Sequence, residues 1–107
     1  MRYIKTYEQS KGITFKQWLE KHPQDLNTTE INCNDSNLID LDGIEQFTNL
    51  KELYCHNNQL TSLPDLPDTL KELYCANNQL PYYELKGYWE WFEKTYPEKI
   101  AAKKYNL

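Results

Sequence analysis

Valine is absent from this 107-residue chain, and glycine is scarce, with three residues against 14 leucines. Because β-branched residues such as valine suit ordinary pleated sheets, a chain that avoids valine is not building a common sheet sandwich. Leucine, isoleucine and phenylalanine together account for 23 of the 107 residues. This fraction is just above the ~20% below which disorder is expected. The core must therefore be small, and the composition indicates a repeated slot shaped for leucine.

Long apolar runs are also absent, and no stretch approaches the ~20 apolar residues of a membrane span. Residues 1–5 are not followed by an apolar segment, so we expect no signal peptide. Three cysteines are an odd number, which fits a reducing compartment better than a disulfide framework. Together these features predict a cytoplasmic protein that does not associate with a membrane.

Charge is unevenly distributed along the chain, although the net charge is only −4. Residues 1–27 carry five basic and three acidic side chains, and residues 81–107 carry five and four. The middle segment, residues 28–80, carries two lysines and nine acidic residues, a net charge of −7. Because nucleic-acid binding needs an excess of positive charge, we expect no direct contact with nucleic acid.

The acidic middle segment contains an internal repeat. Residues 50–60 read LKELYCHNNQL and residues 70–80 read LKELYCANNQL, so ten of eleven positions match and only His56 and Ala76 differ. A weaker copy lies upstream at residues 28–38, where positions 31, 33 and 38 align with positions 53, 55 and 60. A repeat period of about 20 residues indicates a solenoid, in which each unit stacks on the next.

The repeated pattern L-x-x-L-x-C-x-x-N-x-L resembles the leucine-rich repeat family over about residues 28–80. Residues 63–70, LPDLPDTL, are similar to the linkers of its short 20-residue bacterial subtype, and residues 41–50 are more like the 22-residue subtype. The resemblance implies an α/β fold: a short leucine-rich-repeat solenoid of about three coils with parallel strands. It also implies a role in protein-protein interaction.

Strand periodicity predicts which side chains face the core. If residues 52–56 form a strand, Leu53 and Cys55 point inward while the alternating residues point outward. Residues 72–76 repeat this arrangement. The three cysteines, at positions 33, 55 and 75, lie far apart in the sequence, whereas zinc sites need ligands that are closely paired. We therefore predict the cysteines to be small buried core residues.

Asparagines follow the two predicted strands at positions 58 and 78. A side-chain amide there can bond the backbone groups that the bend leaves unpaired. The first copy carries Ser36 at this position, which predicts a weaker or shorter strand ladder in the first coil.

An open stack of three coils would expose leucine side chains and unpaired strand backbone, so flanking segments should cover its ends. Residues 1–27 are the predicted N-terminal cap. A capping box at residues 14–17 opens a helix, and residues 22–23, His-Pro, stop it. Residues 3–9 could form either a strand or a helix.

Residues 81–107 are the predicted helical C-terminal cap. Apolar residues at helical spacing predict one helix over residues 82–95, and a second short helix is expected over residues 97–104. With both caps, the whole chain of residues 1–107 is predicted to be a single domain.

The outward rows of the predicted strands form a candidate partner-binding surface. Glutamates occupy one row and tyrosines the next, and tyrosine offers apolar area with a polar tip, a combination that is enriched at interfaces. The alternative is that this face is a solvated copy of a generic repeat unit. The predicted residues on this surface are Glu30, Glu52, Tyr54, His56, Asn57, Glu72, Tyr74 and Asn77.

Trp91 is a further candidate contact residue. Trp89 and Trp91 lie two residues apart, so both cannot be buried on one face of a helix. Tryptophan is frequent among interface hot spots, so one of the pair is expected to mark a protein contact. The alternative is that the second helix folds back over it.

Catalysis is not indicated. The sequence has no Ser-His-Asp order, phosphate-binding glycine loop or HExxH motif, and its carboxylates follow a surface pattern. We therefore predict no enzyme activity, no cofactor and no metal site.

Two functions from different classes are consistent with the sequence. The first is a non-enzymatic module that binds a basic protein partner, because an acidic surface steers and pairs with positive charge. A sharper version is an inhibitor that occludes a basic groove of a nucleic-acid-handling protein. The alternative is a structural protein that oligomerises through its aromatic C-terminal cap. Of a monomer and an oligomer, the monomer is favoured.

Overall fold

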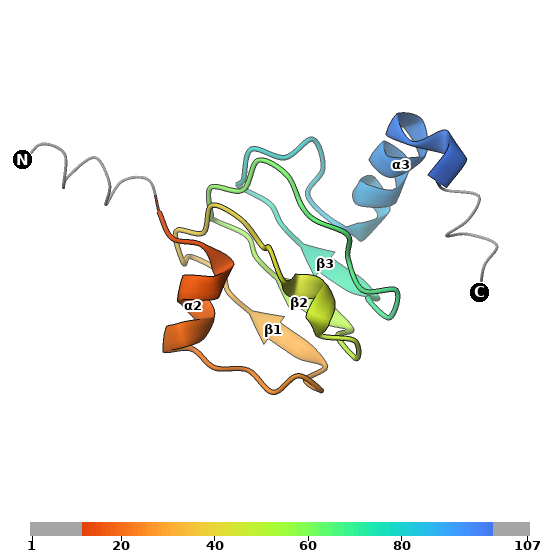
Figure 1. The fold of residues 1–107 in the computed structure, drawn as a ribbon. Helices are drawn as coiled ribbons and strands as arrows, with labels where there is room; N and C mark the ends of the chain where they lie inside the picture. The colour runs from red at the N-terminus through yellow and green to blue at the C-terminus, as the bar shows by residue number, and fades with distance from the viewer. Residues whose placement is uncertain (1–11, 100–107) are drawn as a thin grey trace, which may run out of the picture.

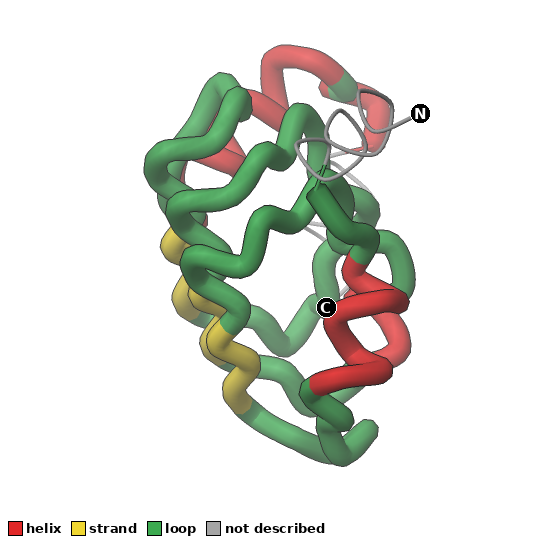
Figure 2. The backbone as a smooth tube through the Cα atoms, turned by 90° about the vertical axis from the view of Figure 1, so that its left-hand side faces the viewer, coloured by secondary structure: helices red, strands yellow, loops and turns green. Residues whose placement is uncertain are grey.

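The computed structural model describes residues 12–99. Three strands, β1 (Glu30–Asn32), β2 (Glu52–Tyr54) and β3 (Glu72–Tyr74), form a parallel sheet in that order. Helix α2 (Phe15–Lys21) lies on the β1 side of the sheet, and helix α3 (Leu85–Thr95) lies on the β3 side (Figure 1). The strands run along one side of the molecule, and loops make up most of the remainder (Figure 2).

The strand register follows the sequence repeat. Glu30 pairs with Glu52, and Glu52 pairs with Glu72, so the alignment that the repeated sequence predicts is confirmed. Regular strand structure ends at Tyr54 and Tyr74, two residues earlier than predicted. The strands are shorter because the chain soon turns through asparagines with positive φ at positions 57 and 77.

One apolar core lies beneath the sheet. Leu53 and Cys55 are fully buried, as are their counterparts in the first and third repeats, which confirms the predicted inward positions. The segments that return from one strand to the next close the core from the other side, and η1, a 3₁₀ helix at Ile44–Gln46, lies in the first of them. The returning segments bury Leu41, Ile44, Phe47, Leu50, Leu66 and Leu70.

Half-buried Asn58 joins the first two repeats through its side chain. Its Oδ1 accepts hydrogen bonds from the backbone N–H groups of Ser36 and Leu38, both at 2.9 Å. Its Nδ2 donates to the carbonyl oxygens of Cys33 and Cys55, both at 3.0 Å. The predicted role of this asparagine in pairing the backbone of the bend is confirmed.

Asn78 makes the equivalent connection between the second and third repeats, and its Oδ1 accepts from the Leu60 N–H at 2.9 Å. Each asparagine therefore bonds to the backbone of the repeat that precedes it. The β1–β2 ladder pairs as many residues as the β2–β3 ladder, so the prediction of a shorter first ladder is wrong. The reason is that Ser36 belongs to the first repeat and has no preceding repeat to bond, so an asparagine is not needed there.

Helix α2 begins at the predicted capping box. The Thr14 hydroxyl accepts from the Gln17 N–H at 3.1 Å, and the Gln17 side chain accepts from the Thr14 N–H at 2.9 Å. A third N–H of the first turn, that of Phe15, donates to the Asp40 carboxylate at 3.0 Å. These three bonds satisfy N–H groups that the first turn of a helix leaves unpaired, and the helix buries Phe15 and Trp18 in the core.

Helix α3 begins at Leu85, three residues later than predicted. The residues before it pair with the edge of the sheet instead, since the Tyr83 carbonyl accepts from the Cys75 N–H at 3.0 Å. Glu84 then caps the helix by accepting from the Gly87 N–H at 2.6 Å. Within residues 12–99, no helix is both long and apolar enough to cross a membrane.

Two predicted segments fall partly or wholly beyond the described range. Residues 97–99 are helical, and the rest of the second helix predicted at residues 97–104 lies outside the described residues. The undecided segment at residues 3–9 also lies outside them.

Candidate functional site

The outward face of the sheet carries a row of three glutamates. Glu30, Glu52 and Glu72 stand in register on adjacent strands, which lie ~4.8 Å apart in a sheet. Glu30 and Glu72 are exposed, and Glu52 is half-buried. Stacked carboxylates repel one another by only tenths of a kcal/mol when they are solvated. The row therefore persists without a partner, and a cation placed beside it relieves the repulsion.

Beside the glutamate row, the rings of Tyr54 and Tyr74 form a stack. Their centroids lie 5.1 Å apart and their planes differ by 8°. The Tyr54 hydroxyl donates to Glu52, and the Tyr74 hydroxyl donates to Glu72, both at 2.8 Å. The bond to Glu52 raises the pKa of Tyr54 to about 12, and the bond to Glu72 raises the pKa of Tyr74. Both phenols are therefore neutral donors with fixed orientations near neutral pH.

The next row contains His56 and Ala76, and the asparagines beyond it have a conformational role. Asn57 and Asn77 adopt φ values of 62° and 58°, a left-handed conformation that asparagine tolerates better than most residues. The Asn77 Nδ2 also donates to the Asn57 Oδ1 at 2.7 Å. The fold thus explains why asparagine occupies both positions without any reference to a partner. The predicted contact role of these two residues stays a prediction.

A shallow groove of about 470 Å³ opens beside the tyrosine stack. Its lining residues are Tyr54, His56, Tyr74, Ala76, Tyr83 and Glu84. Sequence reasoning missed Tyr83 and Glu84, because residues 82–95 were expected to be helical throughout, and it did not count Ala76 among the contact residues. The single mismatch between the two full repeats, at positions 56 and 76, was the signal that could have located the groove.

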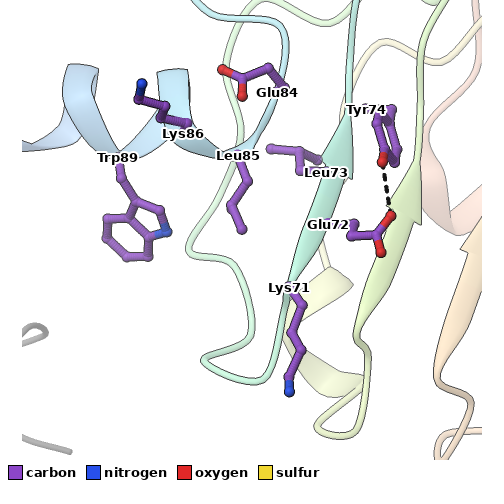
Figure 3. Close-up of a pocket in the computed structure, with 8 residues that line it drawn as sticks. All are labelled: Lys71, Glu72, Leu73, Tyr74, Glu84, Leu85, Lys86 and Trp89. Carbon is purple, nitrogen blue, oxygen red and sulfur yellow. Dashed lines mark hydrogen bonds between the residues drawn. The ribbon is translucent and has the colours of Figure 1, made fainter.

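A second groove, of about 380 Å³, lies between β3 and α3 (Figure 3). Its walls are the side chains of Lys71, Glu72, Leu73, Tyr74, Glu84, Leu85, Lys86 and Trp89. Figure 3 shows Leu85 and Trp89 on the helix side and Lys71 at the start of the strand. Because this groove mixes two lysines with two glutamates, its charge selects no particular kind of ligand.

Comparison with known families identifies part of the repeated segment. The family described as "Leucine Rich repeats (2 copies)" matches residues 29–68. Residues 29–68 therefore contain leucine-rich repeats. Leucine-rich repeats generally mediate protein-protein interaction, and they are typically not enzymes. Neither the curated proteins nor the solved structures gave a match.

Trp91 lies apart from the strand face of the leucine-rich repeats. Its half-buried ring packs against Tyr82 at 5.2 Å and against Tyr96 at 5.9 Å between centroids. Trp89 instead lines the second groove. The structure therefore places Trp91 within an aromatic cluster of the chain itself and does not bring it together with the other predicted contact residues. Its predicted contact with a partner stays a prediction.

The three cysteines, one in each sequence repeat, form a buried column. Cys33, Cys55 and Cys75 are free thiols with at most 1% exposure, as the inward assignment predicted. Burial raises the pKa of Cys33 and Cys75 to about 12 and raises that of Cys55 well above its ordinary value. Among residues 12–99, no group of three or more potential ligands is placed to hold a metal ion.

Proposed function

We propose that this chain is a protein-binding module whose outward strand face contacts a basic protein partner. The observation that supports this is the glutamate row beside the Tyr54–Tyr74 stack. The carboxylates supply complementary charge, and the tyrosines supply apolar contact area with polar tips. In this proposal the contact surface consists of Glu30, Glu52, Tyr54, His56, Asn57, Glu72, Tyr74 and Asn77.

The proposal includes a short solenoid with a cap at each end. The regular strand register and the asparagines that link successive repeats support stacking as the organising principle. Helix α2 buries Phe15 and Trp18, and α3 buries Tyr88 and Phe92, which supports their assignment as caps. Within this proposal the chain is one domain, acts in the cytoplasm and is a monomer.

A sharper form of the proposal is inhibition. The net charge of −7 on residues 28–80 suits a face that occludes a basic groove of a nucleic-acid-handling protein. In that case this chain competes with nucleic acid for the partner and does not itself contact nucleic acid. Addition of nucleic acid should then displace the chain from the captured partner.

The test is capture of partners with the tagged chain, followed by affinity measurements on charge-reversed variants. We expect Glu52→Lys with Glu72→Lys to weaken binding at least about tenfold, because two attractive contacts become repulsive. The control is Glu20→Lys with Glu45→Lys, which makes the same change in net charge at two exposed residues of α2 and η1.

The control variant separates local contact from overall charge. If it loses as much affinity as the face variant, only the net charge matters and the proposed contact surface is wrong. If neither variant changes the affinity, the partner does not bind through the glutamate row. A further variant, Tyr54→Ala with Tyr74→Ala, tests whether the ring stack contributes to the same contact.

Assembly through the aromatic C-terminal segment is the second candidate function. It is supported by Tyr83, which is 67% exposed, and by half-buried Trp89 and Trp91. Sedimentation velocity over a wide concentration range distinguishes the two functions. A dimer that is lost in Trp91→Ala or Tyr83→Ala supports assembly, whereas a monomer at all concentrations supports binding of a different protein.

A further inference from the structure

The one difference between the two full repeats lies at the groove beside the tyrosine stack. Residues 50–60 and 70–80 are identical except that His56 is replaced by Ala76, and both of these residues line the groove. A methyl group fills much less space than an imidazole ring. The smaller side chain therefore leaves a hollow in the strand face at the third repeat, next to Tyr83 and Glu84, which pair with the edge of the sheet.

The walls of this groove are largely aromatic. Tyr54 and Tyr74 present nearly parallel rings, and Tyr83 adds a third phenol that is 67% exposed. The backbone holds Tyr83 in place, because its carbonyl accepts from the Cys75 N–H at 3.0 Å and its neighbour Glu84 pairs with Tyr74 in a β-bridge. The groove thus exists without a ligand and does not require a loop to close over one.

Acidic side chains lie in the groove and beside it. Glu84 lines it, and the carboxylates of Glu52 and Glu72 are bonded to the hydroxyls of two lining tyrosines. A carboxylate offers about four lone-pair positions, so each can accept hydrogen bonds beyond the one already described. Of the six lining residues, His56 is the only one that can carry positive charge.

We propose that this groove binds an arginine side chain of the polypeptide partner. The proposal rests on the proposed function, because it names the basic group that the strand face recognises. A guanidinium ion is planar and weakly hydrated, so it stacks on tyrosine rings, and its five N–H donors can reach surrounding carboxylates. A lysine ammonium ion has the charge but neither the flat shape nor the fork of donors.

A short blocked peptide tests this assignment without the natural partner. The probe is acetyl-Gly-Arg-Gly-amide, titrated into the full chain labelled with ¹⁵N, and the readout is the amide shifts of Tyr74, Ala76, Tyr83 and Glu84. Citrulline and lysine replace arginine in two matched peptides, because citrulline keeps the shape and lacks the charge. We expect saturable shifts at these four amides with arginine and at least about fivefold weaker binding with either replacement.

The variant Ala76→His copies the residue of the second repeat into the third. It is expected to fold normally, because histidine already occupies the equivalent position in the second repeat, and its unfolding midpoint verifies this. By filling the hollow it should abolish the arginine-dependent shifts. His56→Ala widens the groove and should retain them.

Three results overturn the assignment: equal binding of the citrulline peptide, equal binding of the lysine peptide, or unchanged arginine binding in Ala76→His. None of these results bears on the partner experiment. If the peptide test fails while Glu52→Lys with Glu72→Lys still abolishes capture of a protein partner, the strand face remains the contact surface and only the groove loses its role.

Discussion

Asparagine side chains make the hydrogen bonds that the repeated backbone lacks where each strand bends away from the sheet. Asn58 accepts from two backbone N–H groups and donates to three carbonyl oxygens. Asn78 accepts from the Leu60 N–H and donates to three carbonyls in the same way. The difference between them is that Asn58 accepts from two N–H groups of the first repeat, whereas Asn78 accepts from one N–H group of the second repeat.

Removal of these amides should therefore destabilise the protein in a defined order. Asn58→Ala leaves two N–H groups of the first repeat unpaired, and we expect a loss of about 3 kcal/mol in the free energy of unfolding. Asn78→Ala should cost about 1–2 kcal/mol, since it leaves one such N–H. The control is Asn49→Ala, whose side chain makes a 3.4 Å surface contact with Asn27. Denaturant unfolding that ranks Asn49→Ala with Asn58→Ala would contradict this account.

The tyrosine stack makes a second prediction at the scale of the residue. The pKa of Tyr54 is raised from 10.0 to about 12, first by its hydrogen bond to Glu52. Because the folded state holds this proton more tightly than the unfolded chain, the stabilisation is complete below about pH 10 and is lost as the pH rises toward 12. Glu52→Gln should lower the pKa of Tyr54 toward its ordinary value, as followed by tyrosinate absorbance. The matched variant Glu45→Gln should leave it unchanged.

At the scale of elements, two glycines allow the chain to turn where an element joins the repeats. Gly12 has a φ of 89°, and the residue after it pairs with the first repeat: the Ile13 N–H donates to the Asn37 carbonyl at 2.8 Å. A Cβ added to Gly12 would collide with that same carbonyl oxygen. Gly43, before η1, has a φ of 99°, but a Cβ there meets only the end of the flexible Gln46 side chain.

These two glycines form a matched pair for mutagenesis. We expect Gly12→Ala to lower the free energy of unfolding by about 3 kcal/mol or more, because backbone strain adds to a clash with a fixed carbonyl. Gly43→Ala should cost about 1–2 kcal/mol, the penalty of the left-handed conformation alone. Thermal unfolding of both variants measures the difference. Equal losses would show that the contact between residues 12 and 37 does not constrain the N-terminal segment.

The sequence predicted the elements that depend on local pattern and missed those that depend on tertiary pairing. The inward positions of Leu53 and Cys55 follow from strand alternation, and the start of α2 follows from a capping box, so both were predicted. The predicted start of α3 was wrong, because Tyr83 pairs with the edge of the sheet and no local sequence pattern indicates that pairing. The groove was missed for the same reason, since Tyr83 and Glu84 form one of its walls.

At the scale of the whole molecule, the three repeats share a single core. Phe15 of α2, Phe47 of the first return segment and Phe92 of α3 all belong to one continuous buried cluster. Repeat arrays generally need at least three units, because each one buries its apolar face only against its neighbours. A chain with three repeats is at this lower limit, so no single repeat is expected to unfold while the others stay folded.

The column of buried cysteines supplies one reporter in each repeat for this cooperativity. Thiols with pKa values raised to about 12 at Cys33 and Cys75 are almost entirely protonated near neutral pH, and protonated buried thiols do not react with alkylating reagents. Each cysteine should therefore be alkylated only when its repeat opens. If the repeats unfold as one unit, Cys33, Cys55 and Cys75 will be labelled at the same rate at every urea concentration, as measured by mass spectrometry of the separated peptides. Faster labelling of Cys75 in the absence of urea would show that the last repeat opens on its own, and the single-core account would then fail.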